Sequence, residues 1–281
     1  MARRTDPRRA PTSGTAIGLC LAVALAACAS SGSDAGSSAG TSPTETSTPS
    51  PSVSTSPSAS IQDTIEIPPV DGPFDWTIDP ANFVRGVDNR YLPLVPGTTN
   101  VYEGEAEGDH EVNRVEVLRK TKEILGVPCV VVRDTVETNG ELTESTLDWY
   151  AQDVDGNVWY FGERTAEYEH GMVASREGSW EAGVDGALPG VIMPGDPRVG
   201  LAYTQEHYAG KAEDKGKIFD TGRHITVPNG SYDDVLVTED WTPLEKNVLE
   251  RKFYAPDVGV VYETIVRGGD EVIRLVDVKR A

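Results

Sequence analysis

Apolar and polar residues alternate in short runs along the chain beyond residue 98, and turn-forming residues separate the runs. Turn signals such as Asn139-Gly140 and Asn229-Gly230 lie between runs, because glycine readily adopts the positive φ that tight turns need. Connections this short permit only antiparallel pairing. The pattern therefore predicts an all-β fold, a single antiparallel β domain over 61–281 that forms a meander, a barrel or a sandwich. The expected strands are 99–105, 112–120, 129–138, 146–153, 158–167, 218–227, 234–238, 249–254, 258–266 and 272–278.

Three segments depart from this alternation. Short helices are expected at most at 79–84 and 202–215. Residues 178–200 contain six glycines and three prolines, which predicts a long loop. Loops of this length in a compact domain tend to be functional or poorly ordered. Trp180 and Glu181 lie in it and could close over a ligand, although Trp180 could instead cover an open end of the barrel.

An aromatic-rich stretch, 148–163, surrounds an acidic centre, Asp153-Val-Asp-Gly-Asn157. A helix-flanked calcium loop starting at Asp153 would need glycine where Val158 stands and a bidentate glutamate where Arg164 stands, so that type of loop is not expected. Asp155-Gly156 between two strand-like runs instead predicts a hairpin.

The expected hairpin register defines a candidate ligand-binding face. If Asp155-Gly156 forms a two-residue turn, then Gln152 faces Trp159, Tyr150 faces Phe161 and Asp148 faces Glu163, and these six side chains share one face. Trp149, Ala151, Val158 and Tyr160 then lie on the other face. The candidate ligand-binding residues are Asp148, Tyr150, Trp159, Phe161, Glu163, Trp180 and Glu181.

Two carboxylates placed opposite each other on a sheet need compensation. A shared proton, a bound cation such as calcium, or a neighbouring arginine (Arg164 or Arg176) could supply it. Paired carboxylates beside aromatic rings are also typical of sugar-binding and glycoside-cleaving sites. The plain structural alternative is that the carboxylates point into water and the aromatic rings fill a core.

The N-terminal residues resemble an export signal. Residues 1–27 contain four arginines followed by an apolar run that is too short to span a membrane permanently. The run ends in Leu25-Ala26-Ala27-Cys28, which resembles the lipobox of bacterial lipoproteins. This resemblance implies lipidation of Cys28 and anchoring at the outer face of the cell membrane. Residues 29–60 contain 13 serines, five threonines and four prolines, a composition typical of a disordered tether.

The net charge of the chain restricts the kinds of binding partner that are expected. Residues 1–27 hold four of the 25 basic and one of the 45 acidic residues, so their removal leaves a net charge of −23. An acidic surface repels phosphate backbones, and no nucleic-acid partner is expected. Cations, neutral sugars or basic partners are expected to suit it better, and no cofactor is predicted.

Chemical motifs are mostly missing from the sequence. There is no His-Glu-x-x-His, Gly-x-Ser-x-Gly or phosphate-binding glycine loop, and the four histidines are scattered. Cys129 is the only cysteine after Cys28, and its apolar surroundings predict a buried, inert thiol.

Three further stretches carry a family resemblance. Residues 89–99, the hairpin 148–163 and the segment Tyr254-Ala-Pro-Asp-Val-Gly-Val-Val261 resemble uncharacterised exported lipoproteins of high-GC Gram-positive bacteria. The last segment is also similar to curved-sheet lipoprotein carriers. The resemblance implies no particular activity.

We therefore expect a non-enzymatic lipoprotein that binds an envelope glycan, lipid or protein through the 148–163 hairpin and the 178–200 loop. An envelope glycan hydrolase using Asp148 and Glu163 is one alternative. A lipid-carrying or structural lipoprotein is another, and it would contain a large apolar cavity.

Overall fold

The computed structural model describes residues 65–71 and 77–280. The predicted leader, the lipobox with Cys28 and the tether to residue 60 lie outside these residues. Residues 67–280, apart from the gap at 72–76, belong to one compact unit. A single 3₁₀ turn, η1 (Pro80–Asn82), precedes the strands, and Asp79 caps it by accepting a hydrogen bond from the Ala81 amide.

The rest of the regular structure is β-strand. The strands are β1 (Thr99–Ala106), β2 (Asp109–Ile124), β3 (Val127–Thr138), β4 (Glu141–Gln152), β5 (Val158–Arg164), β6 (Glu167–Glu169), β7 (Met172–Ser175), β8 (Trp180–Glu181), β9 (Leu188–Met193), β10 (Ala202–Thr204), β11 (Glu206–His207), β12 (Lys215–Val227), β13 (Gly230–Trp241), β14 (Leu249–Ala255), β15 (Gly259–Arg267) and β16 (Val272–Lys279). The all-β antiparallel prediction is confirmed, because the strand pairs in this part of the chain are antiparallel.

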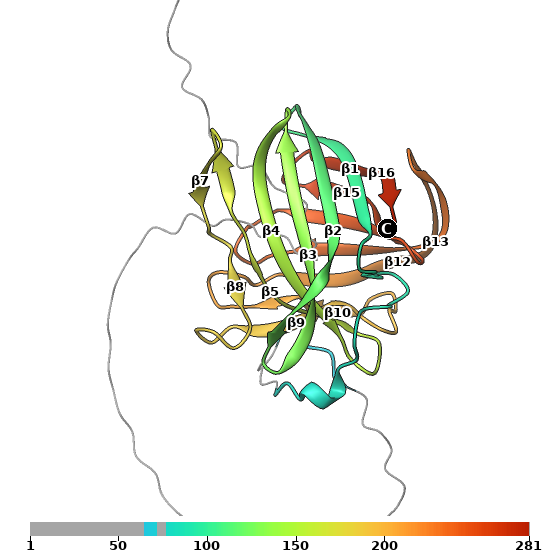
Figure 1. Ribbon diagram of the computed structural model, residues 1–281. Helices are drawn as coiled ribbons and strands as arrows, with labels where there is room; N and C mark the ends of the chain where they lie inside the picture. The colour runs from blue at the N-terminus through green and yellow to red at the C-terminus, as the bar shows by residue number, and fades with distance from the viewer. Residues whose placement is uncertain (1–64, 72–76, 281) are drawn as a thin grey trace, which may run out of the picture. The chain divides into compact units, whose positions relative to one another are not determined.

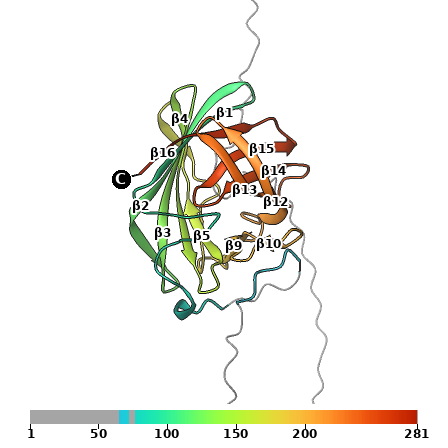
Figure 2. The ribbon, with the colours of Figure 1, turned by 90° about the vertical axis from the view of Figure 1, so that its right-hand side faces the viewer.

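The strands form one nearly closed, barrel-like sheet. Its order is β10-β12-β13-β14-β15-β16-β1-β2-β3-β4-β5-β9-β11. The long strands β2, β3 and β4 form one wall, and β13, β14 and β15 lie across from them (Figures 1 and 2). The hairpin of β6 and β7 projects from this body (Figure 1).

The seam of the barrel lies between the two ends of this strand order. β10 and β11 occupy opposite ends, yet only Gln205 separates them in the chain. Gly190 of β9 packs so closely against this link that a Cβ atom at position 190 would lie 2.4 Å from the Gln205 carbonyl oxygen. The Gln205 amide Nε2 also donates to Asp240 on β13. The chain itself therefore closes the barrel.

The expected register of the 148–163 hairpin is wrong in its middle and right at its end. The Asp153 amide donates to the Asn157 carbonyl, so the loop has three residues instead of two. This shifts the register by one residue, and Gln152 faces Val158, Ala151 faces Trp159, and Tyr150 faces Tyr160.

A β-bulge then reverses the shift. Gly162 has a φ of 119°, which an L-residue rarely adopts, and the strand carries one extra residue opposite Trp149. The register returns to the expected one at the pair Asp148 and Glu163. The two irregularities cancel, so the carboxyl pair is confirmed and the aromatic pairs are wrong.

Two other predictions need correction. The helix expected at 202–215 is wrong, because Tyr203 to Glu206 are all buried at the barrel seam and no helical face is left for solvent. The expected loop at 178–200 contains β8 and β9, both paired to β5. The other expected helix, 79–84, is reduced to the 3₁₀ turn. Cys129 is fully buried, as predicted, and burial raises the pKa of its thiol to about 12.

Candidate functional site

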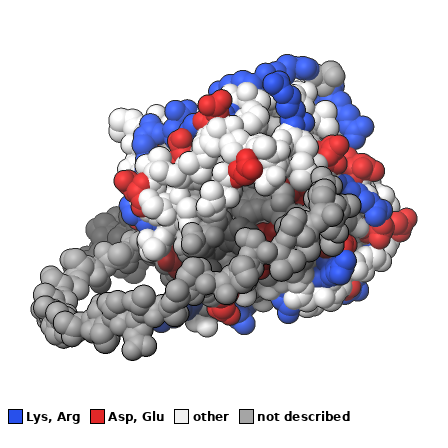
Figure 3. Space-filling model, turned by 90° about the horizontal axis from the view of Figure 1, so that it is seen from below, with Lys and Arg blue, Asp and Glu red and all other residues white. Residues whose placement is uncertain are grey.

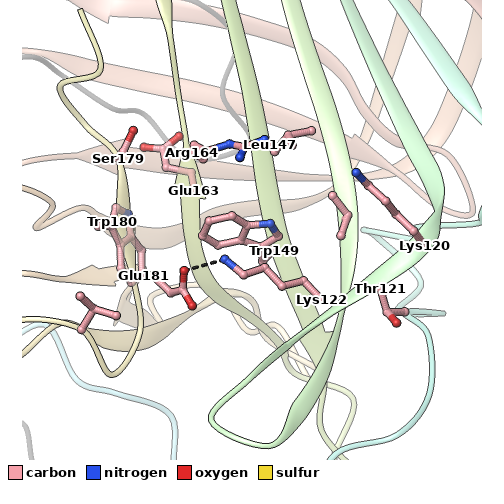
Figure 4. Close-up of a pocket in the computed structure, with 12 residues that line it drawn as sticks. Lys120, Thr121, Lys122, Leu147, Trp149, Glu163, Arg164, Ser179, Trp180 and Glu181 are labelled. Atoms are coloured by element: carbon pink, nitrogen blue, oxygen red, sulfur yellow. Dashed lines mark hydrogen bonds and ion pairs between the residues drawn. The ribbon is translucent and has the colours of Figure 1, made fainter.

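A groove of about 600 Å³ lies on the outer side of the barrel wall (Figure 4). It is bounded by the β4–β5 hairpin and by the segment around β8, the two regions that the sequence had paired as a ligand site. Its lining combines basic, acidic, aromatic and aliphatic side chains. These are Lys120, Thr121, Lys122, Val131, Leu147, Trp149, Glu163, Arg164, Ser179, Trp180, Glu181 and Val184.

An ammonium group lies on the aromatic wall of this groove. The Nζ atom of Lys122 is 3.3 Å from the centre of the Trp149 ring and 2.5 Å from Oε2 of Glu181 (Figure 4). The indole face attracts the cation through its quadrupole, and the carboxylate neutralises it. The face of Trp149 is therefore already occupied, and Glu181 is already paired.

Glu163 is one of the residues that line the groove, but it is 1% exposed and both of its carboxyl oxygens are buried. Neither of its carboxyl oxygens has a hydrogen-bond partner among the described residues. Burial, and then the carboxyl groups of Glu206 and Asp148, raise its pKa well above the usual range. No ion pair joins Glu163 or Asp148 to an arginine in the described part of the chain. The arginine compensation considered from sequence is therefore not present there.

Asp148 shares the inner face of the wall with two stacked tyrosines. The Tyr160 hydroxyl donates to Asp148 Oδ1 at 2.8 Å, and the rings of Tyr150 and Tyr160 stack with centroids 4.8 Å apart. Burial raises the pKa of Asp148 to about 7, although the Tyr160 hydrogen bond opposes the shift. A neutral, proton-carrying carboxyl at this pair is thus the form that burial favours.

Many more carboxyl groups line the inside of the barrel. We call these eleven residues the interior carboxyl cluster: Glu111, Asp134, Glu144, Asp148, Glu163, Glu206, Asp214, Asp240, Glu250, Glu263 and Glu271. Burial raises the pKa of Glu111 and Asp240 to about 7, that of Glu206 to about 8 and that of Glu271 to about 9. Most of the cluster therefore holds protons near neutral pH.

Lys252 is the buried cation within this cluster. Its Nζ lies 3.1 Å from Glu250 Oε2 and 3.8 Å from Asp240 Oδ2. Burial alone would lower the pKa of Lys252, but the carboxylates of Glu250, Glu263 and Asp240 raise it well above its usual value. Lys252 stays charged and compensates only part of the cluster.

Because these carboxyl groups are buried, the formal net charge of the chain does not describe the charge of its surface. Twelve carboxyl side chains but a single lysine are buried in the described residues, which accounts for more than half of the net charge of −20. On the face shown in Figure 3, acidic and basic side chains are interspersed around the rim. The outer surface is therefore less acidic than the composition implies.

The other predicted site residues have structural contacts. Trp159 and Phe161 pack edge-on against Phe83, on the opposite face from Asp148 and Tyr150. Trp180 is buried, and its indole nitrogen donates to Glu206 Oε1 at 3.3 Å. The predicted single face is thus split, with Asp148, Tyr150 and Glu163 inside the barrel and Trp159 and Phe161 elsewhere.

The acidic centre of the hairpin is also structural. Asp153 accepts hydrogen bonds from the Asp155 and Asn157 amides, from the Asn157 side chain and from Trp159 Nε1. Hydrogen-bond donors therefore surround the carboxyl oxygens of Asp153. The side chain of Asp155 lies in the hairpin loop. Within residues 65–71 and 77–280, no group of three or more His, Cys, Asp or Glu side chains is arranged to hold a metal ion.

Sequence reasoning missed Lys120, Lys122 and Lys252. Lys122 follows a register shift in β2, between Val117 and Thr121, that no residue pattern announced. Lys252 alternates with Glu250 and Tyr254 on β14, while Leu249 and Phe253 face the other way. Polar residues therefore occupy buried positions of β14 and apolar residues half-buried ones, a sequence pattern that indicates a polar interior.

The comparisons with known proteins give little further information. No protein-family model matches the chain, and no curated protein is significantly similar to it. One solved structure, described as "a putative lipoprotein from Parabacteroides distasonis ATCC 8503", aligns at 13% identity and a TM-score of 0.38, over 68% of this chain and 99% of that one. A likeness this distant transfers neither fold nor function. In the described residues, no helix is long and apolar enough to cross a membrane.

Proposed function

We propose that the protein is a membrane-anchored extracytoplasmic lipoprotein that binds a ligand or envelope component, without catalysis, in the groove between the β4–β5 hairpin and β8. One observation carries the proposal. The groove of about 600 Å³ combines an aromatic ring and aliphatic side chains with two exposed cations, Lys120 and Arg164, between the hairpin and β8. A concave site with an apolar lining and a few polar groups is typical of small-molecule binding sites.

The anchoring half of the proposal rests on the lipobox-like string that ends at Cys28. A Cys28→Ala variant should lose incorporation of radiolabelled palmitate and appear in the medium or periplasm. Retention of the label by this variant would contradict lipidation at Cys28.

The binding half is tested by blocking the groove. Val184 lines the groove and is 50% exposed, so Val184→Trp adds bulk there at little cost to folding. Val199 is 61% exposed and does not line the groove, so Val199→Trp is the matched control. Native mass spectrometry against a panel of envelope glycan, lipid and peptide fragments should show a bound mass with wild type and V199W. That mass should be absent with V184W, and equal binding by both variants would place the ligand elsewhere.

A glycan hydrolase using Asp148 and Glu163 is the second candidate. The direct pairing of these residues across β4 and β5 favours it, as does the raised pKa of both. Their 0% and 1% exposure argues against it, because a sugar chain must reach both carboxyl groups. A lipid carrier is less favoured still, since carboxyl groups line the barrel interior where an apolar cavity would be needed.

A further inference from the structure

The groove has unequal charge compensation. Its acidic residue Glu181 is paired with Lys122. Its other two cations, Lys120 and Arg164, are exposed and have no ion pair within the described residues. The unpaired charges at the rim are therefore both positive.

The remaining acidic residue of the groove does not offset them. Glu163 is faced by Asp148 and Glu144 from β4, by Glu206 from β11 and by Asp214. These groups and burial favour its neutral form, and both of its carboxyl oxygens are buried. The groove therefore presents two unpaired cations at the rim and no unpaired negative charge.

The wall between these polar groups is aliphatic. Val131 on β3 and Leu147 on β4 line the groove from adjacent strands, two residues apart in register, and Val184, which follows β8, also lines it. An apolar portion of a ligand would be buried against them.

We infer that the groove binds a small anionic molecule, a phosphate or carboxylate attached to an apolar group, with Lys120 and Arg164 facing the anion. The inference rests on the proposed function, since it names the class of ligand for the same groove. It reverses the expectation of cationic or basic partners that the acidic composition suggested, because more than half of that acidity is buried.

The test uses three probes with one alkyl chain and different head groups: hexyl phosphate, hexylamine and hexyl glucoside. Calorimetric titration of the full mature protein should detect hexyl phosphate binding, weakened by added salt, and little binding of the other two. Lys120→Ala and Arg164→Ala should each weaken it roughly tenfold, as expected for loss of a charge-assisted contact. Arg119→Ala removes an exposed charge one residue from the groove lining and should change affinity by less than about twofold.

The pH dependence of the affinity provides a further test, because a general attraction between opposite charges would not depend on the protonation of the buried carboxyl groups. Affinity for heptanoate, a carboxylate probe with the same alkyl chain that stays singly charged over this range, should fall as pH rises from 6 to 9, because the carboxyl groups buried beneath the groove lose protons and repel the anion. Glu163→Gln should flatten that fall. A stronger affinity at pH 9 than at pH 6 would overturn the inference.

Two further arms separate the possible sources and failures. Inorganic phosphate should bind more weakly than hexyl phosphate if the aliphatic wall contributes, and binding to phosphatidylglycerol vesicles rather than to free hexyl phosphate would indicate a lipid headgroup as source. Preferential binding of hexylamine or hexyl glucoside, lost in Val184→Trp, would overturn the anion inference and leave the groove as the ligand site. Binding of hexyl phosphate that Val184→Trp does not affect would overturn both.

Discussion

The two faces of the β4 and β5 wall handle charge in opposite ways. On the outer face, charged groups remain at least partly in water. Lys122 and Glu181 pair there, each about one third exposed, whereas Lys120 and Arg164 are exposed without an ion pair among the described residues. On the inner face, carboxyl groups crowd together without enough cations and become neutral by holding protons. The outer face should therefore respond to salt, whereas the inner face should respond to pH.

The largest effect should come from titrating the inner face. A raised folded-state pKa means that the folded protein binds more protons than the unfolded chain, so the stability present at low pH is lost as pH rises through the folded pKa. These values are about 7 for Asp148 and Asp240, 8 for Glu206 and 9 for Glu271. At about 1.4 kcal/mol per pKa unit and group, these four groups should lose roughly 10 kcal/mol of stabilisation between pH 6 and 9, or about 20–40 °C in Tm.

Calorimetry or circular dichroism across this pH range measures the loss. A Tm that stays constant or rises between pH 6 and 9 would show that the interior carboxyl cluster is compensated in another way.

Removal of the interior cation should have the next largest effect. Lys252→Met leaves Glu250 and Asp240 buried without their partner, which typically costs about 3–5 kcal/mol at neutral pH. The loss should shrink at pH 5, where Asp240, whose pKa burial raises to about 7, is protonated. Urea unfolding measures both values, and Lys279→Met, at an exposed and loosely paired lysine, is the matched control. Equal stability of K252M and wild type at pH 7 would contradict a charged Lys252.

A smaller effect is expected when one carboxyl group is made permanently neutral. Glu163→Gln should stabilise the protein by about 1–2 kcal/mol at pH 8.5, because the variant no longer loses a proton in a buried site. Little change is expected at pH 5, where wild-type Glu163 is already neutral. Glu169→Gln, at an exposed position, serves as the control for the substitution itself. Destabilisation of E163Q at pH 8.5 would indicate that the ionised carboxylate is the folded form.

The smallest effect should come from an exposed ion pair of the outer face that does not line the groove. Arg133 and Glu116 form an ion pair of 3.2 Å between side chains that are 46% and 43% exposed. Exposed pairs contribute about 0–1 kcal/mol, so Arg133→Ala should change the unfolding free energy by less than about 0.5 kcal/mol. A loss of more than 1 kcal/mol in the free energy of unfolding would contradict the expected difference between the outer and the inner face.

Much of the fold was predictable because local turn chemistry and alternation act over a few residues. The hairpin at Asp155-Gly156 follows from such a local signal, whereas Asp148 pairs with Glu163 as predicted only because the three-residue loop and the later bulge cancel. The bulge at Gly162 does not, because a glycine inside a strand can be a bulge or an ordinary position. The sequence therefore does not predict that the aromatic side chains lie on two different faces of the hairpin.

The candidate site was only partly predictable for a second reason. Strand patterns are interpreted on the assumption that apolar side chains point inward, and this barrel places Glu250 and Lys252 inside instead. The seam at Gln205 depends on closure of the whole strand order, which no local pattern shows, so the helix expected at 202–215 is wrong. In both places, the tertiary environment determines which side chains are buried, and local sequence patterns do not contain that information.

The seam also determines how the domain would respond to mechanical load. The carbonyl oxygens of Pro68 and Pro69 accept hydrogen bonds from the amide and hydroxyl of Thr204, the last residue of β10. A pull on the chain upstream of Pro68 would thus reach the barrel at Thr204, next to the residue that joins its two ends. Force applied to the chain upstream of Pro68 would therefore be delivered through these two hydrogen bonds to the residues beside the closure of the barrel.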